Sequence, residues 1–274
     1  METPDCDTSR YASTSVIDDL DPNFADFVMN AQQLASGTHW KIGTFRGHDI
    51  RVSPFFLVLI GLFVFMGLNE FSRLPYQLMW APVLFFSILL HELGHAAATK
   101  KCGFGTSKII LHGFGGVAIS RRSHTKPKDG MFIALAGPAV TGLLAFGFLG
   151  ALIGYGVFTG GESLTVLGHF LWLMVLANFF WLILNLLPIY PMDGGQTLMY
   201  FFRKKGAGQG TALVKTAKVS LVTIIITGLL AILVIPGGFL IFIIFAFMGY
   251  MNWQILQQAK GGGPGGPMMM RMPR

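Results

Sequence analysis

Two histidines and a glutamate stand together in the segment His91-Glu92-Leu93-Gly94-His95. In an α-helix, residues four apart are separated by about 6 Å along the axis and by about 40° around it. His91 and His95 would therefore face the same way and could bind one metal ion. The Glu92 carboxylate lies beside them, where it could accept a proton from a water molecule on the metal. The spacing predicts a metal centre that activates water.

The surroundings of this motif are apolar. No charged residue occurs from Ala81 to Leu90, so the motif lies in what reads as a membrane span. Ionisable groups at that depth are costly and usually mark function. The whole chain is 53% hydrophobic and 12% charged, whereas soluble domains are about 25% charged. The composition therefore predicts a membrane protein.

A catalytic zinc ion needs a third protein ligand and an open position for water. Asp193 is the acidic residue that ends a predicted span after the motif. This fourth span runs in the same direction as the second, which brings Asp193 to a depth comparable with His91 and His95. Pro188 and Pro191 would end or unwind the helix there. Irregular backbone at membrane depth is tolerated only where it is buried in protein or lines a water-filled cavity. The alternative is an ordinary helix end with a glycine C-cap.

Uncharged runs of the length that crosses a bilayer, about 17–25 residues, occur repeatedly. They predict six spans, near residues 52–69, 76–99, 131–157, 164–188, 213–235 and 238–258. With six spans, nineteen of the twenty Lys and Arg residues fall on one side, and Arg73 alone falls on the other. The positive-inside rule then predicts a multi-pass protein with both termini in the cytoplasm, in the inner membrane if the cell is bacterial. The basic clusters are expected at anionic lipid head groups, and no nucleic-acid partner is predicted.

The two ends of the chain differ from the apolar middle. Residues 1–40 carry seven acidic residues and Arg10 as their one basic residue, with no signal-peptide pattern. This segment is predicted to be a disordered cytoplasmic tail, and a regulatory or partner-docking role is the alternative. Residues 260–274 are rich in Gly, Pro and Met and are also predicted to be disordered. A single membrane domain is expected at 41–259.

These motifs resemble the site-2 protease family of intramembrane zinc metalloproteases. The resemblance rests on the His91–His95 motif in one span and on Asn185-Leu-Leu-Pro-Ile-Tyr-Pro-Met-Asp193-Gly194 later in the chain. It covers residues 40–205. Three shorter segments resemble a first amphipathic strand, a membrane-dipping β-hairpin loop and the glycine–proline turn of the third core helix, at residues 41–51, 111–118 and 136–138.

The resemblance implies an all-α polytopic membrane protein with six transmembrane helices and a small membrane-associated β-hairpin or strand element. It implies that His91, His95 and Asp193 bind one Zn²⁺ per chain and that Glu92 is the general base, as their spacing also predicts. It further implies that Asn185 helps to bind the substrate or the tetrahedral intermediate. Many relatives have Asn where this chain has Thr141, so no role is transferred to Thr141.

Ser107–Ser120 contains glycines that would let a hairpin approach another backbone closely. An exposed edge there could take up an unwound transmembrane substrate as an extra strand. Gly115, Gly116 and Val117 are the residues expected to hold that substrate, and Val117 and Ile119 are expected on or beside the edge. The alternative is a structural loop that plugs the cytoplasmic opening.

The predicted function is therefore zinc-dependent hydrolysis of a peptide bond in or near the transmembrane segment of another membrane protein, in signalling by regulated intramembrane proteolysis. Two other classes remain as alternatives. A membrane metal transporter would line a path with ligands on several spans, and a catalytically silent membrane scaffold would not need Glu92. A protease of the other His-Glu-x-x-His type would need a downstream glutamate ligand, and the spans after Glu92 contain none.

Overall fold

The computed structural model of the chain describes residues 38–66, 70–113, 115–120, 126–160, 165–234 and 239–259. The two tails that the sequence predicts to be disordered lie almost wholly outside these residues. The first described strand, β1 (Trp40–Phe45), begins one residue before the predicted start of the membrane domain.

Four stretches of the described residues are helical, long enough and apolar enough to cross a membrane. They comprise α3 (Leu74–Leu78) with α4 (Trp80–Lys101), α5 (Pro127–Phe158), α6 (Val166–Leu186) and most of α8 (Gln209–Val234). The first and last predicted spans are occupied by the shorter helix α2 (Pro54–Met66) and by the 21-residue helix α9 (Phe239–Ala259). Helices thus occupy all six predicted spans, while the count of six crossings stays a prediction.

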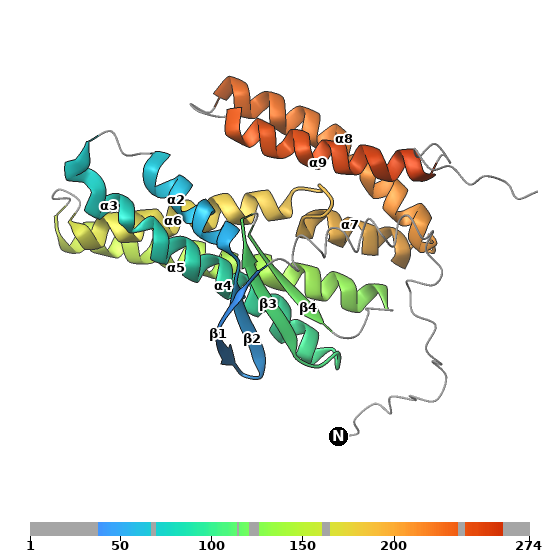
Figure 1. Ribbon diagram of the computed structural model, residues 1–274, viewed down its shortest axis with the longest axis horizontal. Helices are drawn as coiled ribbons and strands as arrows, with labels where there is room; N and C mark the ends of the chain where they lie inside the picture. The colour runs from blue at the N-terminus through green and yellow to red at the C-terminus, as the bar shows by residue number, and fades with distance from the viewer. Residues whose placement is uncertain are drawn as a thin grey trace, which may run out of the picture. The chain divides into compact units, whose positions relative to one another are not determined.

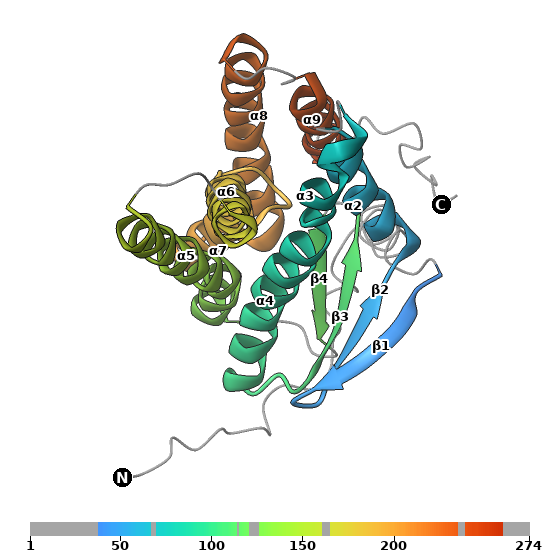
Figure 2. The same cartoon turned by 90° about the vertical axis from the view of Figure 1, so that its left-hand side faces the viewer.

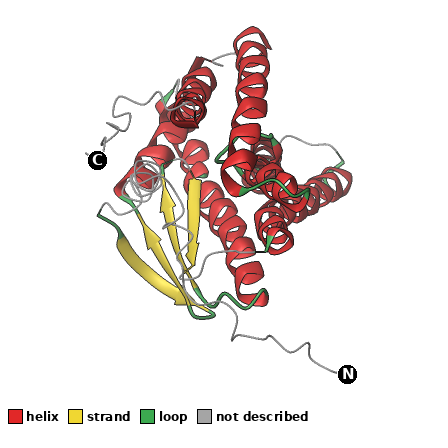
Figure 3. Ribbon diagram, turned by 90° about the vertical axis from the view of Figure 1, so that its right-hand side faces the viewer, coloured by secondary structure: helices red, strands yellow, loops and turns green. Residues whose placement is uncertain are grey.

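The described strands form one sheet in the order β1-β2-β3-β4, which lies on one side of the helices (Figure 3). β2 (His48–Val52) follows β1 through a tight turn in which Arg46 and Gly47 both have positive φ, as in type I′ hairpin turns. β3 (Ser107–His112) and β4 (Gly115–Ser120) form a second hairpin. The two hairpins join through parallel pairing of β2 with β3, and α2, α3 and α4 provide the crossover. The predicted hairpin is therefore present, as half of a larger sheet.

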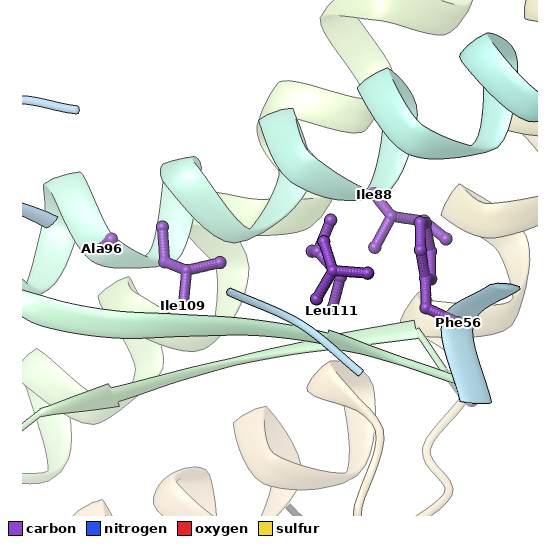
Figure 4. Close-up of a cluster of buried hydrophobic side chains, with 6 residues drawn as sticks. Phe56, Ile88, Ala96, Ile109 and Leu111 are labelled. Carbon is purple, nitrogen blue, oxygen red and sulfur yellow. The ribbon is translucent and has the colours of Figure 1, made fainter. Parts of the chain in front are cut away.

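One face of this sheet packs against α4. Ile109 pairs with Ala118 and Leu111 with Gly116, and alternate residues of a strand share a face. Figure 4 shows Ile109 and Leu111 beneath α4, next to a set of buried apolar side chains that includes Phe56, Ile88 and Ala96. Burial of this apolar area fixes the helix that carries the histidine motif against β3 and β4.

On the other side of α4 lie α5 and α6, so that α4 separates the sheet from α5 (Figure 2). The chain then forms α7 (Asp193–Lys204), which contacts α5 and α8. α8 and α9 pack side by side as a pair (Figure 1). The pair contacts the segment between α6 and α7 through buried side chains of both helices.

Three local expectations need correction. The fourth span ends at Leu186, with Leu187 as its C-cap, and Asp193 is the first residue of α7 rather than the end of that span. Gly194 and Gly195 lie inside α7, so the glycine C-cap alternative is wrong. Gly137 and Pro138 lie inside α5, which is continuous from Pro127 to Phe158, so no turn occurs there. Membrane helices tolerate such a proline because neighbouring groups satisfy the freed carbonyl.

Candidate metal centre

Helix α4 places His91 and His95 one turn apart on one face, as their spacing predicts. Their Nε2 atoms lie 3.1 Å apart. His91 is buried, and the His95 side chain is 12% exposed. Glu92 is buried on the adjacent face of the same turn. The rings are held by the packing of α4 between the sheet and α5 rather than by local structure alone.

Asp193 reaches the two histidines from the first turn of α7. Its Oδ2 atom lies 3.1 Å from Nε2 of His91 and 3.3 Å from Nε2 of His95. Among the His, Cys, Asp and Glu residues that the structure describes, these three have side-chain ligand atoms close enough together to bind one metal ion. The fold therefore brings together the three ligands that the sequence predicts.

The spacing of these atoms fits a tetrahedral metal ion. Ligand atoms about 2.0–2.1 Å from a tetrahedral zinc ion lie about 3.3 Å from one another. The three distances here are 3.1, 3.1 and 3.3 Å. Asp193 Oδ2 is buried and, among the described residues, has no hydrogen-bond partner. A buried carboxylate oxygen without a hydrogen bond is costly unless a cation compensates it. The donor set, two imidazoles and a carboxylate, suits zinc.

Contacts on the far side of each ring determine which nitrogen is free to bind metal. Nδ1 of His95 lies 2.7 Å from the carbonyl oxygen of Ile133, which can only accept, so Nδ1 carries the proton. Nδ1 of His91 lies 2.8 Å from Thr141 Oγ1, and that hydroxyl donates its own proton to the Gly137 carbonyl. Both Nε2 atoms therefore present a lone pair toward Asp193, which is the tautomer that metal binding requires.

Thr141 is the residue that sequence reasoning missed. It is fully buried in α5, and its hydroxyl contacts Nδ1 of His91, although no role is transferred to it from the asparagine of many relatives. The available signal was a hydroxyl one turn after Gly137 in an apolar stretch of α5. Polar groups in such positions are usually hydrogen-bonded to something specific.

Two glycines allow α4 and α5 to approach closely at the site. A Cβ atom on Gly94 would lie 2.8 Å from the Ala136 carbonyl oxygen. A Cβ atom on Gly137 would lie 2.6 Å from Cε1 of His95 and 2.7 Å from Nε2 of His91. The backbone of α5 therefore forms a wall of the metal centre, and any side chain at position 137 would occupy the space of the imidazoles.

Strand β4 passes directly over Glu92. A Cβ atom on Gly116 would lie 2.7 Å from Cδ of Glu92 and 2.8 Å from its Oε1. Gly115, which has a φ of +124°, packs against the Trp181 ring of α6. Asn185 donates a hydrogen bond to the Trp181 carbonyl. Of the predicted substrate-binding residues, Gly116 thus lies beside Glu92, the predicted general base, while Gly115 and Asn185 contact Trp181.

Val117 pairs with Ile110 of β3 and follows Gly116 in β4. Because strand side chains alternate, Val117 points to the face opposite the one that packs on Glu92. The same alternation places Ile119 on that opposite face. β4 is the last strand in the sheet order, as the prediction of an edge at Val117 and Ile119 requires.

A model of the family described as peptidase family M50 matches residues 79–165, which include the His91–His95 motif. A zinc metalloprotease of Methanocaldococcus jannaschii is 32% identical over 168 residues, covering 61% of this chain and 47% of that protein. The Bacillus subtilis protein YwhC, whose name also places it among zinc metalloproteases, is 31% identical over 150 residues, covering 45% of this chain and 67% of that protein. The chain spans about half the length of the first curated relatives it matches.

The fold has a counterpart among solved structures. The site-2 protease from Methanocaldococcus jannaschii superposes with a TM-score of 0.55 at 22% identity, over 80% of this chain and 95% of that chain. Fold and site together define an integral membrane protein with a metal centre among its helices. The chain belongs to the site-2 protease family, peptidase family M50. The family predicted from the motifs is thus confirmed, and the geometry of the site fits the predicted zinc cofactor.

Proposed function

We propose that this protein is a zinc-dependent intramembrane endopeptidase that hydrolyses a peptide bond in or near the transmembrane segment of another membrane protein. One observation carries the proposal. His91, His95 and Asp193 converge on one point beside the buried Glu92, and α4, which carries both histidines, belongs to a helical stretch apolar enough to cross a membrane. A purely structural zinc site would not need a carboxylate held next to its ligands without being one of them.

His91, His95 and Asp193 would hold the zinc ion. When bound, zinc lowers the pKa of its water toward neutrality and polarises a carbonyl. Glu92 accepts the proton of the attacking water and returns it to the leaving amine. Because Gly116 has no Cβ atom, β4 can pass close to the Glu92 carboxylate.

The first prediction concerns the third ligand. Replacing Asp193 with Asn should weaken zinc binding because a neutral amide is a poorer ligand than a carboxylate, and Asp193→Ala should weaken it further. Metal content and cleavage of a reconstituted transmembrane substrate should fall together in both variants. Full zinc content and full cleavage in both would show that Asp193 is not a ligand. Zinc binding without cleavage of any membrane protein by the wild-type chain would favour a transporter or a scaffold.

The proposed substrate enters as an extra strand on β4. A transmembrane helix satisfies its peptide groups internally, so a protease must unwind it and offer other partners. In the described part of the chain, β4 pairs with β3 alone, which leaves its other edge available. A strand added there would pass Gly116 and hence Glu92. Gly115, Gly116, Val117 and Asn185 are proposed to hold the substrate or the tetrahedral intermediate.

Proline substitutions on β4 give the second prediction. The Ser53 N–H donates to the Leu111 carbonyl, so the backbone of Leu111 faces β2 and that of Ile110 faces β4. Val117 and Ile119, which pair with Ile110 and Lys108, therefore direct their N–H groups at β3, and the Ala118 N–H faces the open edge. Ala118→Pro removes a donor on the open edge, so cleavage should slow while zinc content stays unchanged. Val117→Pro and Ile119→Pro should instead disturb pairing with β3. Misfolding or metal loss in Ala118→Pro would favour the plug interpretation, and normal cleavage by Ala118→Pro would rule out strand addition.

We also propose that residues 41–259 form one membrane domain with six crossings and cytoplasmic termini. The third prediction is that reporter fusions at Ser123 and Gly206 read cytoplasmic and that a fusion at Gly160 reads exterior. An exterior signal at Ser123, a position outside the described residues, would contradict the six-span topology. Cleavage near the cytoplasmic side would release a cytosolic fragment, which is the basis for a signalling role.

A further inference from the structure

The segment between α6 and α7 carries Asp193 to the metal centre. It runs from Leu187 to Met192 without regular secondary structure. Irregular backbone at membrane depth must find its hydrogen bonds in neighbouring protein. In this chain, two side chains from α8 and α9 provide some of these hydrogen bonds, and both bind the backbone of Tyr190.

Ser220 of α8 and Asn252 of α9 hold Tyr190 from two directions. The Tyr190 N–H donates to Ser220 Oγ over 2.9 Å, and Asn252 Nδ2 donates to the Tyr190 carbonyl over 2.6 Å. The Ser220 hydroxyl also lies 3.2 Å from the Pro188 carbonyl, two residues earlier. Both side chains are fully buried. These hydrogen bonds therefore satisfy backbone groups of the segment that are buried away from water.

Packing makes the segment rigid between these bonds and Asp193. Ile189 is fully buried in an apolar cluster with Ile224 of α8 and Phe245 of α9. On the other side, a Cβ atom on Gly195 would lie 2.5 Å from the Ile189 carbonyl oxygen. The first turn of α7 thus rests directly on the backbone that Ser220 and Asn252 hold. A shift of Tyr190 would be passed to Asp193 three residues later.

We propose that Ser220 and Asn252 are positioning residues of the metal centre, which place Asp193 Oδ2 between the two histidines through the Tyr190 peptide. This inference rests on the metal site of the proposed function. The histidines have their own orienting partners in Thr141 and Ile133. Within the described part of the chain, Asp193 Oδ2 has no hydrogen-bond partner, so the segment that carries Asp193 sets the position of this atom. α8 and α9 are therefore functional parts of the zinc site.

The expected effect is a loss of zinc affinity. Removing groups that orient metal ligands typically costs about 10–100-fold in affinity. Ser220 and Asn252 contact the Tyr190 backbone and not Asp193 itself, so their effect on the ligand is indirect. Ser220→Ala and the nearly isosteric Asn252→Leu should therefore each weaken zinc binding by about 10-fold, near the lower end of that range. The full-length protein in detergent would be titrated with zinc against a competing chelator. The thermal unfolding of the metal-free protein would be measured in parallel.

The matched control is Thr216→Ala. Thr216 lies one turn before Ser220 on α8 and is equally buried, but its hydroxyl donates to Ala212 of the same helix. This variant should lose stability in the metal-free form and keep wild-type zinc affinity. Co²⁺-loaded Ser220→Ala should also show a changed visible absorption spectrum, since a displaced carboxylate alters the ligand geometry, whereas Thr216→Ala should not.

Equal losses of affinity in Thr216→Ala and Ser220→Ala would show a general packing effect and overturn the proposal. Zinc affinities within twofold of wild type for both Ser220→Ala and Asn252→Leu would also overturn it. If Asn252→Leu fails to fold, the comparison of Ser220→Ala with Thr216→Ala decides the question alone. A wild-type protein that binds no zinc would instead refute the proposed function itself.

Discussion

Glu92→Gln protein will bind zinc as tightly as the wild type and will cleave its substrate at least about 100-fold more slowly. Glu92 is adjacent to His91 but is not among the three converging ligands, so its replacement leaves the metal centre intact. The glutamine amide has nearly the same shape but cannot accept the proton of the attacking water. Zinc content and the cleavage of a transmembrane substrate in proteoliposomes would be measured on the same preparation.

The matched control for this experiment is Glu70→Gln, which removes an exposed carboxylate that accepts a hydrogen bond from Ser72. It should retain both zinc and activity. Wild-type cleavage by Glu92→Gln would exclude Glu92 as the general base. Loss of zinc together with cleavage would instead make Glu92 a ligand. Because Glu92→Gln is expected to bind substrate without cutting it, this variant is also suited to trapping substrates.

The candidate metal ligands can be predicted from the sequence because simple rules place them. Helical geometry alone brings His91 and His95 to one face, and the direction of the spans brings Asp193 to their depth. The β3–β4 hairpin was also expected from its local sequence. These features depend on periodicity and topology, which an apolar chain with few charges displays clearly.

The residues that complete the site could not be predicted in the same way. Thr141 contacts His91, and Asn252 contacts Tyr190, only because α5 and α9 pack at particular rotations against distant segments. The parallel pairing of β2 with β3 likewise depends on a crossover through three helices. Sequence patterns specify which face of a helix is apolar, but in a membrane protein nearly every face is apolar. Helix rotation is then set by small residues and buried hydrogen bonds.

Gly137→Ala protein is expected to lose zinc and activity, although the change adds one methyl group. The Cβ atom would lie 2.6 Å from Cε1 of His95 and 2.7 Å from Nε2 of His91, both well inside van der Waals contact. The methyl cannot swing away, because Cβ is fixed by the backbone of α5. Gly94 of α4 faces the Ala136 carbonyl, so the two helices are already as close as glycine allows. The imidazoles must therefore leave their places or the helices must separate.

Either response separates the ligand atoms that now lie 3.1–3.3 Å apart, so zinc affinity should fall at least about 100-fold, as for loss of the contacts that orient metal ligands. Gly142→Ala is the matched control, since its Cβ would meet the nearest atom of Leu182 at 3.8 Å, an ordinary contact. Chelator competition on the two purified variants would measure the difference. Wild-type zinc affinity in Gly137→Ala would mean that the histidines bind metal in another arrangement, with α5 no longer forming a wall of the site.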